Sequence, residues 1–173
     1  MSEHISKQFD AELESVRSRV LQMGGLVEEQ ILRAVEALDS GDMERIDKVI
    51  ADDHRVNALE VGLDEACSHI IARRQPAAGD LRLLIAVIKT ITDLERIGDE
   101  AQRIGILSAR LAANAHPRDR YDELKSLSEH VQEMVESVCE AMEPEVVLDD
   151  WEAVAPDVMA LRIISELTEV HHG

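Results

Sequence analysis

The chain has 173 residues, with 36 acidic and 18 basic side chains and a formal net charge of −18 at pH 7. Hydrophobic residues make up 45% of it and aromatic residues only 2%, which is typical of helices packed through aliphatic side chains. The acidic excess speaks against nucleic-acid binding, because no dominant basic face is available to meet phosphates. Metal cations or basic partners fit this charge better.

The two cysteines, Cys67 and Cys139, form no CxxC motif, and isolated cysteines suit a reducing compartment better than a disulfide framework. Residues 1–5 lack the apolar core of a signal peptide. No run reaches the ~18 apolar residues of a membrane span. We therefore expect a cytoplasmic protein with no membrane span.

Apolar residues recur at steps of three and four along most of the chain, which indicates amphipathic helices. Gly41 and Pro76 mark the first two breaks, and the polar stretch 116–120 marks the third. The third helix is apolar on several sides, so we expect it to be the most buried. The predicted helices cover about residues 5–38, 43–74, 77–114, 121–142 and, more weakly, 157–170.

The predicted fold is all-α, with an antiparallel three-helix bundle over residues 1–116 and a truncated second helical repeat over residues 117–173. A weak internal repeat supports this division, because a shift of ~104 residues aligns similar residues along a whole helix. It pairs Val27 with Val131 and Ile31 with Val135. The second half is expected to form only an incomplete bundle.

Glu95 and Asp99 lie four residues apart on one face of the third helix, and part of that face is apolar. An unpaired carboxylate is costly in such surroundings. Glu60 and Asp64 repeat the spacing on the preceding helix, and a glycine stands inside each interval. Two antiparallel helices can bring both pairs together, and oxygen-rich clusters bind divalent or trivalent cations. The spacing is also compatible with two solvated helix faces.

Signatures of common enzymes are missing: the chain has no GxSxG, HExxH or Walker-type GxxxxGK[ST] sequence. A di-iron bundle would be expected to carry Glu-x-x-His on two helices, and the one match, residues 169–172, lies at the end of the sequence. We expect no catalytic and no cofactor-binding residues. Four arginines can hold phosphate or, more in keeping with the acid excess, pair with local acids: Arg73, Arg74, Arg96 and Arg103.

Several motifs together closely resemble the PhoU family: residues 9–13 (FDAEL), 23–28 (MGGLVE), 73–76 (RRQP) and 94–99 (LERIGD). The resemblance covers about residues 4–142. It implies two similar three-helix bundles whose E(D)xxxD motifs bind multinuclear metal clusters in some members. Carried over, the metal-ligating positions are Glu60, Asp64, Glu95 and Asp99, and the implied cofactor is a divalent or trivalent transition metal: Fe, Zn or Mn.

The resemblance also implies a role as a regulatory adaptor of phosphate homeostasis. Such proteins repress phosphate-starvation signalling and phosphate uptake through contacts with the ATPase of a phosphate ABC transporter and a sensor histidine kinase. They are not enzymes. Two alternatives remain open: a metal-storage or metal-dependent ferritin-like bundle, and a structural module whose incomplete second half drives formation of a homodimer.

Overall fold

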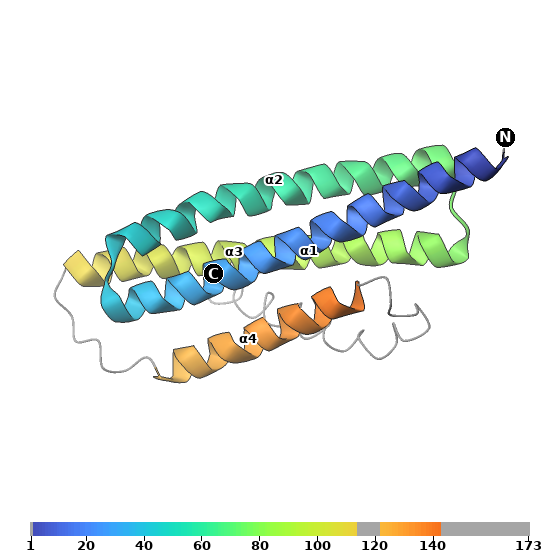
Figure 1. Ribbon diagram of the computed structural model, residues 1–173. Helices are drawn as coiled ribbons and strands as arrows, with labels where there is room; N and C mark the ends of the chain where they lie inside the picture. Colours follow the sequence, from blue (N-terminus) through green and yellow to red (C-terminus); the bar gives the residue numbers. More distant parts are fainter. Residues whose placement is uncertain (1, 114–121, 143–173) are drawn as a thin grey trace, which may run out of the picture.

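Four long helices make up the computed structural model, which describes residues 2–113 and 122–142 (Figure 1). They are α1 (Ser2–Ser40), α2 (Met43–Arg74), α3 (Ala78–Ala113) and α4 (Asp122–Ala141). The predicted bounds of the first four helices agree with these to within a few residues. The prediction of an all-α protein is therefore confirmed, whereas the predicted helix over residues 157–170 lies outside the described residues.

Helices α1, α2 and α3 form an up-down-up bundle in which each helix packs against the other two (Figure 1). Gly41 has a φ of 68°, a conformation that glycine adopts without steric cost, and it reverses the chain after α1. Asp42 then caps α2, because its carboxylate accepts a hydrogen bond from the Glu44 amide at 2.9 Å. This turn confirms the predicted break at residues 39–42.

The second turn depends on Gln75, which has a φ of 47° and ends α2 in the left-handed conformation. Its backbone amide donates to the carbonyl of Ile71 at 3.2 Å, as in a helix C-cap. Pro76 follows and cannot continue the helix. The chain thereby turns within three residues, which fixes the register between α2 and α3.

The core is aliphatic and runs the length of the bundle. Helices α1 and α3 contribute most of its buried apolar side chains, and Leu84, Val87, Ile91 and Leu94 of α3 are all fully buried, as the apolar sequence of α3 predicted. Each such side chain stabilises the fold by roughly 1.5–3 kcal/mol relative to exposure. None of the four described helices is both long and apolar enough to cross a membrane.

Helix α4 lies antiparallel to α1 and packs chiefly against it (Figure 1). The Gln132 side-chain amide donates to the backbone carbonyl of Glu28 at 3.4 Å, and these two residues are equivalent under the predicted repeat. Antiparallel packing of a helix on its own repeat copy creates a local pseudo-twofold axis near this contact. The division of the chain at residue 116 falls between α3 and α4, where residues 114–121 lie outside the described part.

Close packing at this crossing depends on Gly24. A Cβ atom placed on Gly24 would lie 2.2 Å from the Cys139 sulfur and 3.9 Å from Val135. No real Cβ tolerates the first distance, so the missing side chain makes room for the Cys139 thiol. Burial raises the pKa of that thiol to about 12, and the negative charges of Glu28 and Glu136 add to the shift. Cys139 is therefore a packing residue kept in the thiol form.

Candidate functional site

An acidic cluster lies where the middle of α2 packs against the middle of α3. The register between these helices follows from three close pairs: Gly98 beside Val56, Gly105 beside Val49, and Gln102 bonded to Asp53. Continued toward the α2–α3 turn, this register sets Glu95 near Glu60. One helical turn farther from the α2–α3 connection, the same register sets Asp99 near Asp53.

Glu95 is partly buried, and the pKa of its carboxyl group is raised. Burial is the main cause, followed by the negative charges of Asp99, Glu60 and Asp53, while Arg96 opposes the shift. Three acidic neighbours thus act on one carboxylate. Glu60, Glu95 and Asp99, which the sequence predicted to lie together, do share this region of the bundle.

Asp53 is the member that sequence reasoning missed. Its side chain is only 4% exposed, and Oδ2 accepts a hydrogen bond from the Gln102 amide at 2.7 Å. Oδ1 is buried and has no hydrogen-bond partner. Burial raises the pKa of this carboxyl, and the charge of Asp99 raises it further. Asp53 is therefore a buried acid that faces another acid.

The adjacent Asp52 shows how unusual that environment is. Asp52 is also buried, at 6% exposure, but it forms ion pairs with Arg33 and, at 2.9 Å, with Arg55. A buried carboxylate normally needs such pairing. Asp53 forms no such ion pair with an arginine: Oδ2 accepts from the Gln102 amide, and Gln30 and His54 offset only part of the rise in its pKa.

Asp64, the fourth predicted ligand, is exposed. Its charge acts on Cys67, whose pKa is raised to about 11 by burial and, second, by Asp64. It does not appear among the charges acting on Glu95. The prediction that Asp64 ligates a metal stays untested, but in this structure Asp53, and not Asp64, acts on Glu95 and is acted on by Asp99.

The periodicity of α2 carried a signal for Asp53, which borders the same apolar stripe as Asn57, Glu60 and Asp64. The four-residue spacing of Glu60 and Asp64 instead favoured Asp64 as the second acid from α2. Only the register against α3 distinguishes these acids, because it decides which turn of α2 faces Asp99.

The donor chemistry of the cluster fits a cation. Besides Asp53 Oδ1, two more buried oxygens nearby have no hydrogen-bond partner: Asn57 Oδ1 and Gln30 Oε1. Carboxylate and amide oxygens are ligands for hard and borderline metal ions. However, no group of three or more His, Cys, Asp or Glu side chains within residues 2–113 and 122–142 is arranged to hold a metal ion. Metal binding would therefore require these side chains to change rotamer.

The glycines inside the two acidic intervals have separate explanations. A Cβ on Gly98 would lie 3.0 Å from Gln30 Oε1 and 3.4 Å from Val56, so Gly98 lets α1, α2 and α3 approach one another. Gly62 lies under Arg19, whose Nη1 donates to the Gly62 carbonyl at 3.1 Å. Both glycines thus serve close packing.

The arginines considered for phosphate binding pair locally where their partners are defined. Arg74 forms two hydrogen bonds with the Glu12 carboxylate, at 2.7 and 3.0 Å, and this bond is the main cause of the lowered pKa of Glu12. Arg103 pairs with Glu100 one turn away. The predicted pairing with local acids is confirmed for these two.

The matching family model is the PhoU domain, which covers residues 20–107. The phosphate-specific transport system accessory protein PhoU of Serratia marcescens is 47% identical over 141 residues, covering 82% of this chain and 58% of that protein. Its counterpart in Escherichia coli strain K12 is 44% identical over the same length. This chain therefore spans about 58% of the length of these relatives.

A crystal structure of PhoU from Pseudomonas aeruginosa has the same helical fold. It aligns with a TM-score of 0.73 and 44% sequence identity, over 77% of this chain and 64% of that one. The sequence motifs, the family model and the solved structure thus agree on the family of this chain. This chain belongs to the PhoU family.

Proposed function

We propose that this chain is a regulatory adaptor of phosphate homeostasis that represses phosphate-starvation signalling and phosphate uptake through protein contacts. The observation that carries the proposal is its 44–47% identity, over 82% of its length, to accessory proteins of the phosphate-specific transport system. The proposed partners are the ATPase of a phosphate ABC transporter and a sensor histidine kinase.

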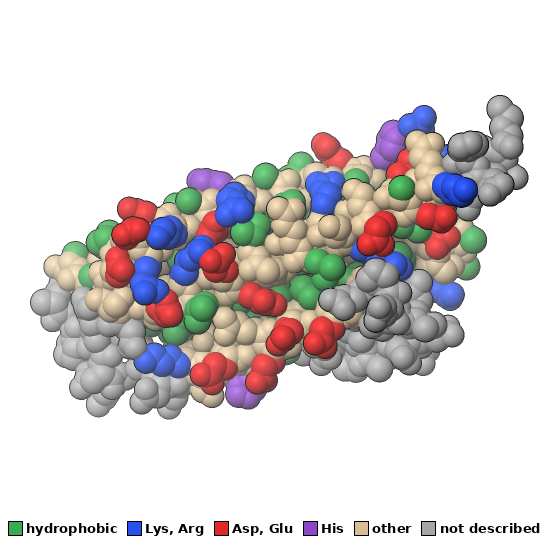
Figure 2. All heavy atoms as spheres, in the orientation of Figure 1, with side chains coloured by type: hydrophobic (Ala, Val, Ile, Leu, Met, Phe, Trp, Pro, Cys, Tyr) green, Lys and Arg blue, Asp and Glu red, His purple; other side chains and the backbone are tan. Residues whose placement is uncertain are grey.

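The surface is compatible with adaptor function. On the face shown in Figure 2, acidic side chains crowd α4, whereas acidic and basic side chains are intermixed over the three-helix bundle. The α4 sequence carries Glu129, Glu133, Glu136 and Glu140 along its length. A negative surface of this kind accelerates association with a basic partner and makes the association sensitive to salt.

A metal ion at the acidic cluster is the second part of the proposal. The ion would be held by four carboxylates, those of Asp53, Glu60, Glu95 and Asp99. Asp64 is the remaining predicted ligand. Bound Fe, Zn or Mn, as one ion or a multinuclear cluster, would supply positive charge that offsets the repulsion among these acids. The chain itself supplies the buried, unpartnered oxygens that such an ion needs.

The regulatory proposal can be tested in bacteria that lack their own PhoU-family protein. In phosphate-rich medium, expression of this chain should lower the activity of a phosphate-starvation reporter. Failure to lower it at a normal protein level would refute the adaptor function. Since the chain matches only part of its relatives, a full-length relative serves as the positive control.

The metal proposal is tested separately on purified protein. Elemental analysis and thermal melting with Fe, Mn or Zn should show binding that Glu95→Ala plus Asp99→Ala abolishes. The matched control is Asp10→Ala plus Glu14→Ala, an exposed acidic pair with the same four-residue spacing on α1. Equal metal binding by both double variants, or no binding by the parent chain, would contradict the metal site. Asp53→Asn and Asp64→Asn then show which of the two α2 residues contributes.

Two alternatives have their own readouts. A ferritin-like function would show as iron oxidation by the purified chain, and the lack of a Glu-x-x-His sequence in the four described helices speaks against it. A structural role in dimerisation would show as a dimer by light scattering at micromolar concentration. A monomer that represses the reporter supports the adaptor.

A further inference from the structure

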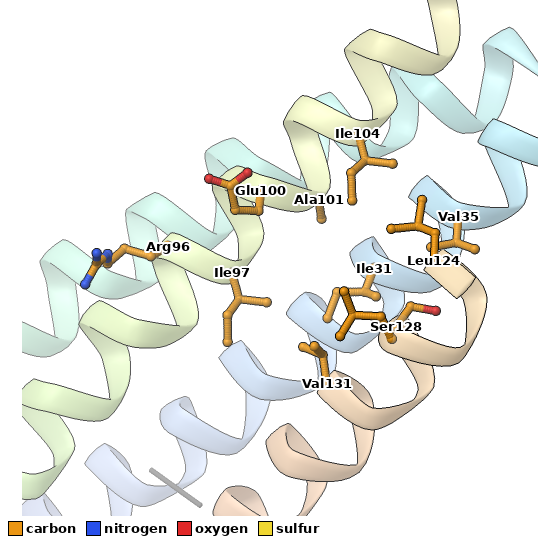
Figure 3. A pocket seen from close by; sticks show the side chains of 11 residues that line it. Ile31, Val35, Arg96, Ile97, Glu100, Ala101, Ile104, Leu124, Ser128 and Val131 are labelled. Carbon is orange, nitrogen blue, oxygen red and sulfur yellow. The ribbon is translucent and has the colours of Figure 1, made fainter. Parts of the chain in front are cut away.

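Of the described side chains of α1, Gln30 alone is both polar and buried, and none of it is exposed to solvent. The next residue, Ile31, points into a hollow of about 190 Å³ between α1, α3 and α4 that is lined mainly by aliphatic side chains (Figure 3). Gln30 instead contacts α2 and α3. Burying an amide costs free energy unless its atoms are hydrogen-bonded, so the partners of Gln30 decide what this residue can do.

Only one end of the Gln30 amide is paired. Nε2 donates to the backbone carbonyl of Val49 at 3.2 Å. Because a carbonyl oxygen only accepts hydrogen bonds, this contact fixes which end of the amide faces α2. The other end, Oε1, lies beside Gly98, where a Cβ would be only 3.0 Å away. Oε1 is buried and has no hydrogen-bond partner, so it is an acceptor for which the described part of the chain supplies no donor.

This unpaired oxygen lies at the acidic cluster. Asp99 follows Gly98 on α3, and Gln30 opposes the rise in the pKa of Asp53 that burial and the charge of Asp99 cause. Asp53 Oδ1 and Asn57 Oδ1, one turn apart on α2, are also buried without a partner. Amide oxygens and ionised carboxylates are all acceptors, so they cannot satisfy one another. A cation among them would satisfy all three oxygens.

We propose that Gln30 is a metal ligand contributed by α1, with its Oε1 binding the same ion as Asp53 and Asp99. This inference rests on the proposed metal site and extends that site from two helices to three. The carboxylates must rotate to meet an ion, whereas the contact with Val49 already holds the amide in place. A neutral oxygen also adds a ligand without adding repulsion, and carbonyl oxygens suit Mn²⁺.

The test measures Mn²⁺ binding to the purified full chain by equilibrium dialysis and by the rise in Tm on adding Mn²⁺. Gln30→Met keeps the size of the side chain and removes its oxygen. It should weaken Mn²⁺ binding about tenfold or more and reduce the rise in Tm. Gln22→Met is the matched control, because Gln22 is an exposed glutamine on the same helix, and it should bind Mn²⁺ as the parent chain does.

The metal-free proteins separate ligation from a role in packing. Gln30→Met should leave the urea midpoint unchanged or raise it, because it removes an unpaired buried oxygen and the Val49 carbonyl keeps its bond within α2. Gln30→Glu keeps an oxygen at this position and adds a buried negative charge. It should lower the metal-free urea midpoint, yet bind Mn²⁺ at least as tightly as the parent chain.

Each outcome decides a specific part of the proposal. If Gln30→Met bound Mn²⁺ as the parent does while Glu95→Ala plus Asp99→Ala abolished binding, the role of Gln30 would be wrong and the metal site would stand. No Mn²⁺ binding by the parent chain would overturn both. If Gln30→Met lost binding together with metal-free stability, Gln30→Glu would decide: retained binding supports ligation, and lost binding assigns Gln30 to packing.

Discussion

Helices α1 and α4 are repeat copies with similar apolar patterns, yet their equivalent side chains are buried to different extents. Met23 of α1 is fully buried, whereas its repeat equivalent Leu127 on α4 is 54% exposed. The difference arises from the number of neighbours, because α1 packs against α2, α3 and α4 while α4 packs chiefly against α1. An amphipathic sequence therefore specifies which face of a helix is apolar, but the burial of that face depends on its partners.

The largest test of this comparison truncates the two equivalent side chains. Met23→Ala should lower the free energy of unfolding by about 2–5 kcal/mol, because it leaves a cavity in a closed core. Leu127→Ala should change it by less than about 0.5 kcal/mol, since more than half of that residue is exposed to solvent. Urea unfolding measures both values. Equal losses would show that α4 is as well covered as α1.

The next test concerns the crossing of the two helices. Gly24→Ala places a methyl group against the Cys139 sulfur and should destabilise the protein by about 1–3 kcal/mol through overpacking. Gly25→Ala is the matched control, because Gly25 is exposed and has no neighbour within 4 Å of the added carbon. That change should stabilise α1 by about 0.5–1 kcal/mol.

Hydrogen exchange should locate the effect of Gly24→Ala in α4, where faster amide exchange would report weaker docking. Adding Cys139→Ala should restore part of the lost stability by removing the clashing sulfur. If Gly24→Ala and Gly25→Ala had the same effect, the close approach of α1 and α4 at Gly24 would be wrong.

A smaller effect is expected at the acidic cluster, where burial and then Asp99 raise the pKa of Asp53. A carboxyl whose pKa is higher in the folded state contributes stability that is fully present below the unfolded value of about 4. That stability is lost as the pH rises through the folded pKa. In metal-free protein, Asp53→Asn should therefore raise the free energy of unfolding at pH 7 and reduce its decline between pH 4 and 7.

The gain at pH 7 should be on the order of 1 kcal/mol, because hydrogen bonds from Gln102 and Gln30 already offset part of the cost of burying this charge. Asp64→Asn is the control, since Asp64 is exposed, and it should leave the pH dependence nearly unchanged. Urea unfolding across this pH range provides the measurement. A larger effect from Asp64 than from Asp53 would contradict the position that the structure gives to these two acids.

The smallest effect should come from the charges between α1 and α4. Burial raises the pKa of Glu28, and the charge of Glu136 adds to the shift. Glu136→Gln should stabilise α4 docking at pH 7 by no more than about 0.5 kcal/mol, and high salt should reduce the gain. Glu129→Gln, on the same helix, is the control. Precise urea midpoints at low and high salt would distinguish the two variants.

Sequence reasoning was most successful where local chemistry decides the outcome. Gly41, Gln75 and Pro76 end or begin helices through backbone preferences that need no distant partner, so the helix bounds were predictable. Three of the four predicted acids also share one region of the bundle. Helical spacing puts Glu95 and Asp99 on one face of α3, and the short turn after α2 brings Glu60 into the same region. Whether any of the four ligates a metal remains a prediction.

The sequence by itself determined that the protein is helical, which face of each helix is apolar, and to which family the chain belongs. The tertiary structure decided that Asp53 lies against Asp99 while Asp64 is exposed, and that Gly24 receives the Cys139 thiol. Helical periodicity is the same on every turn of a helix, so it cannot say which turn meets which neighbour. That choice depends on the register between packed helices, which the turns and the close glycine contacts fix only in the folded protein.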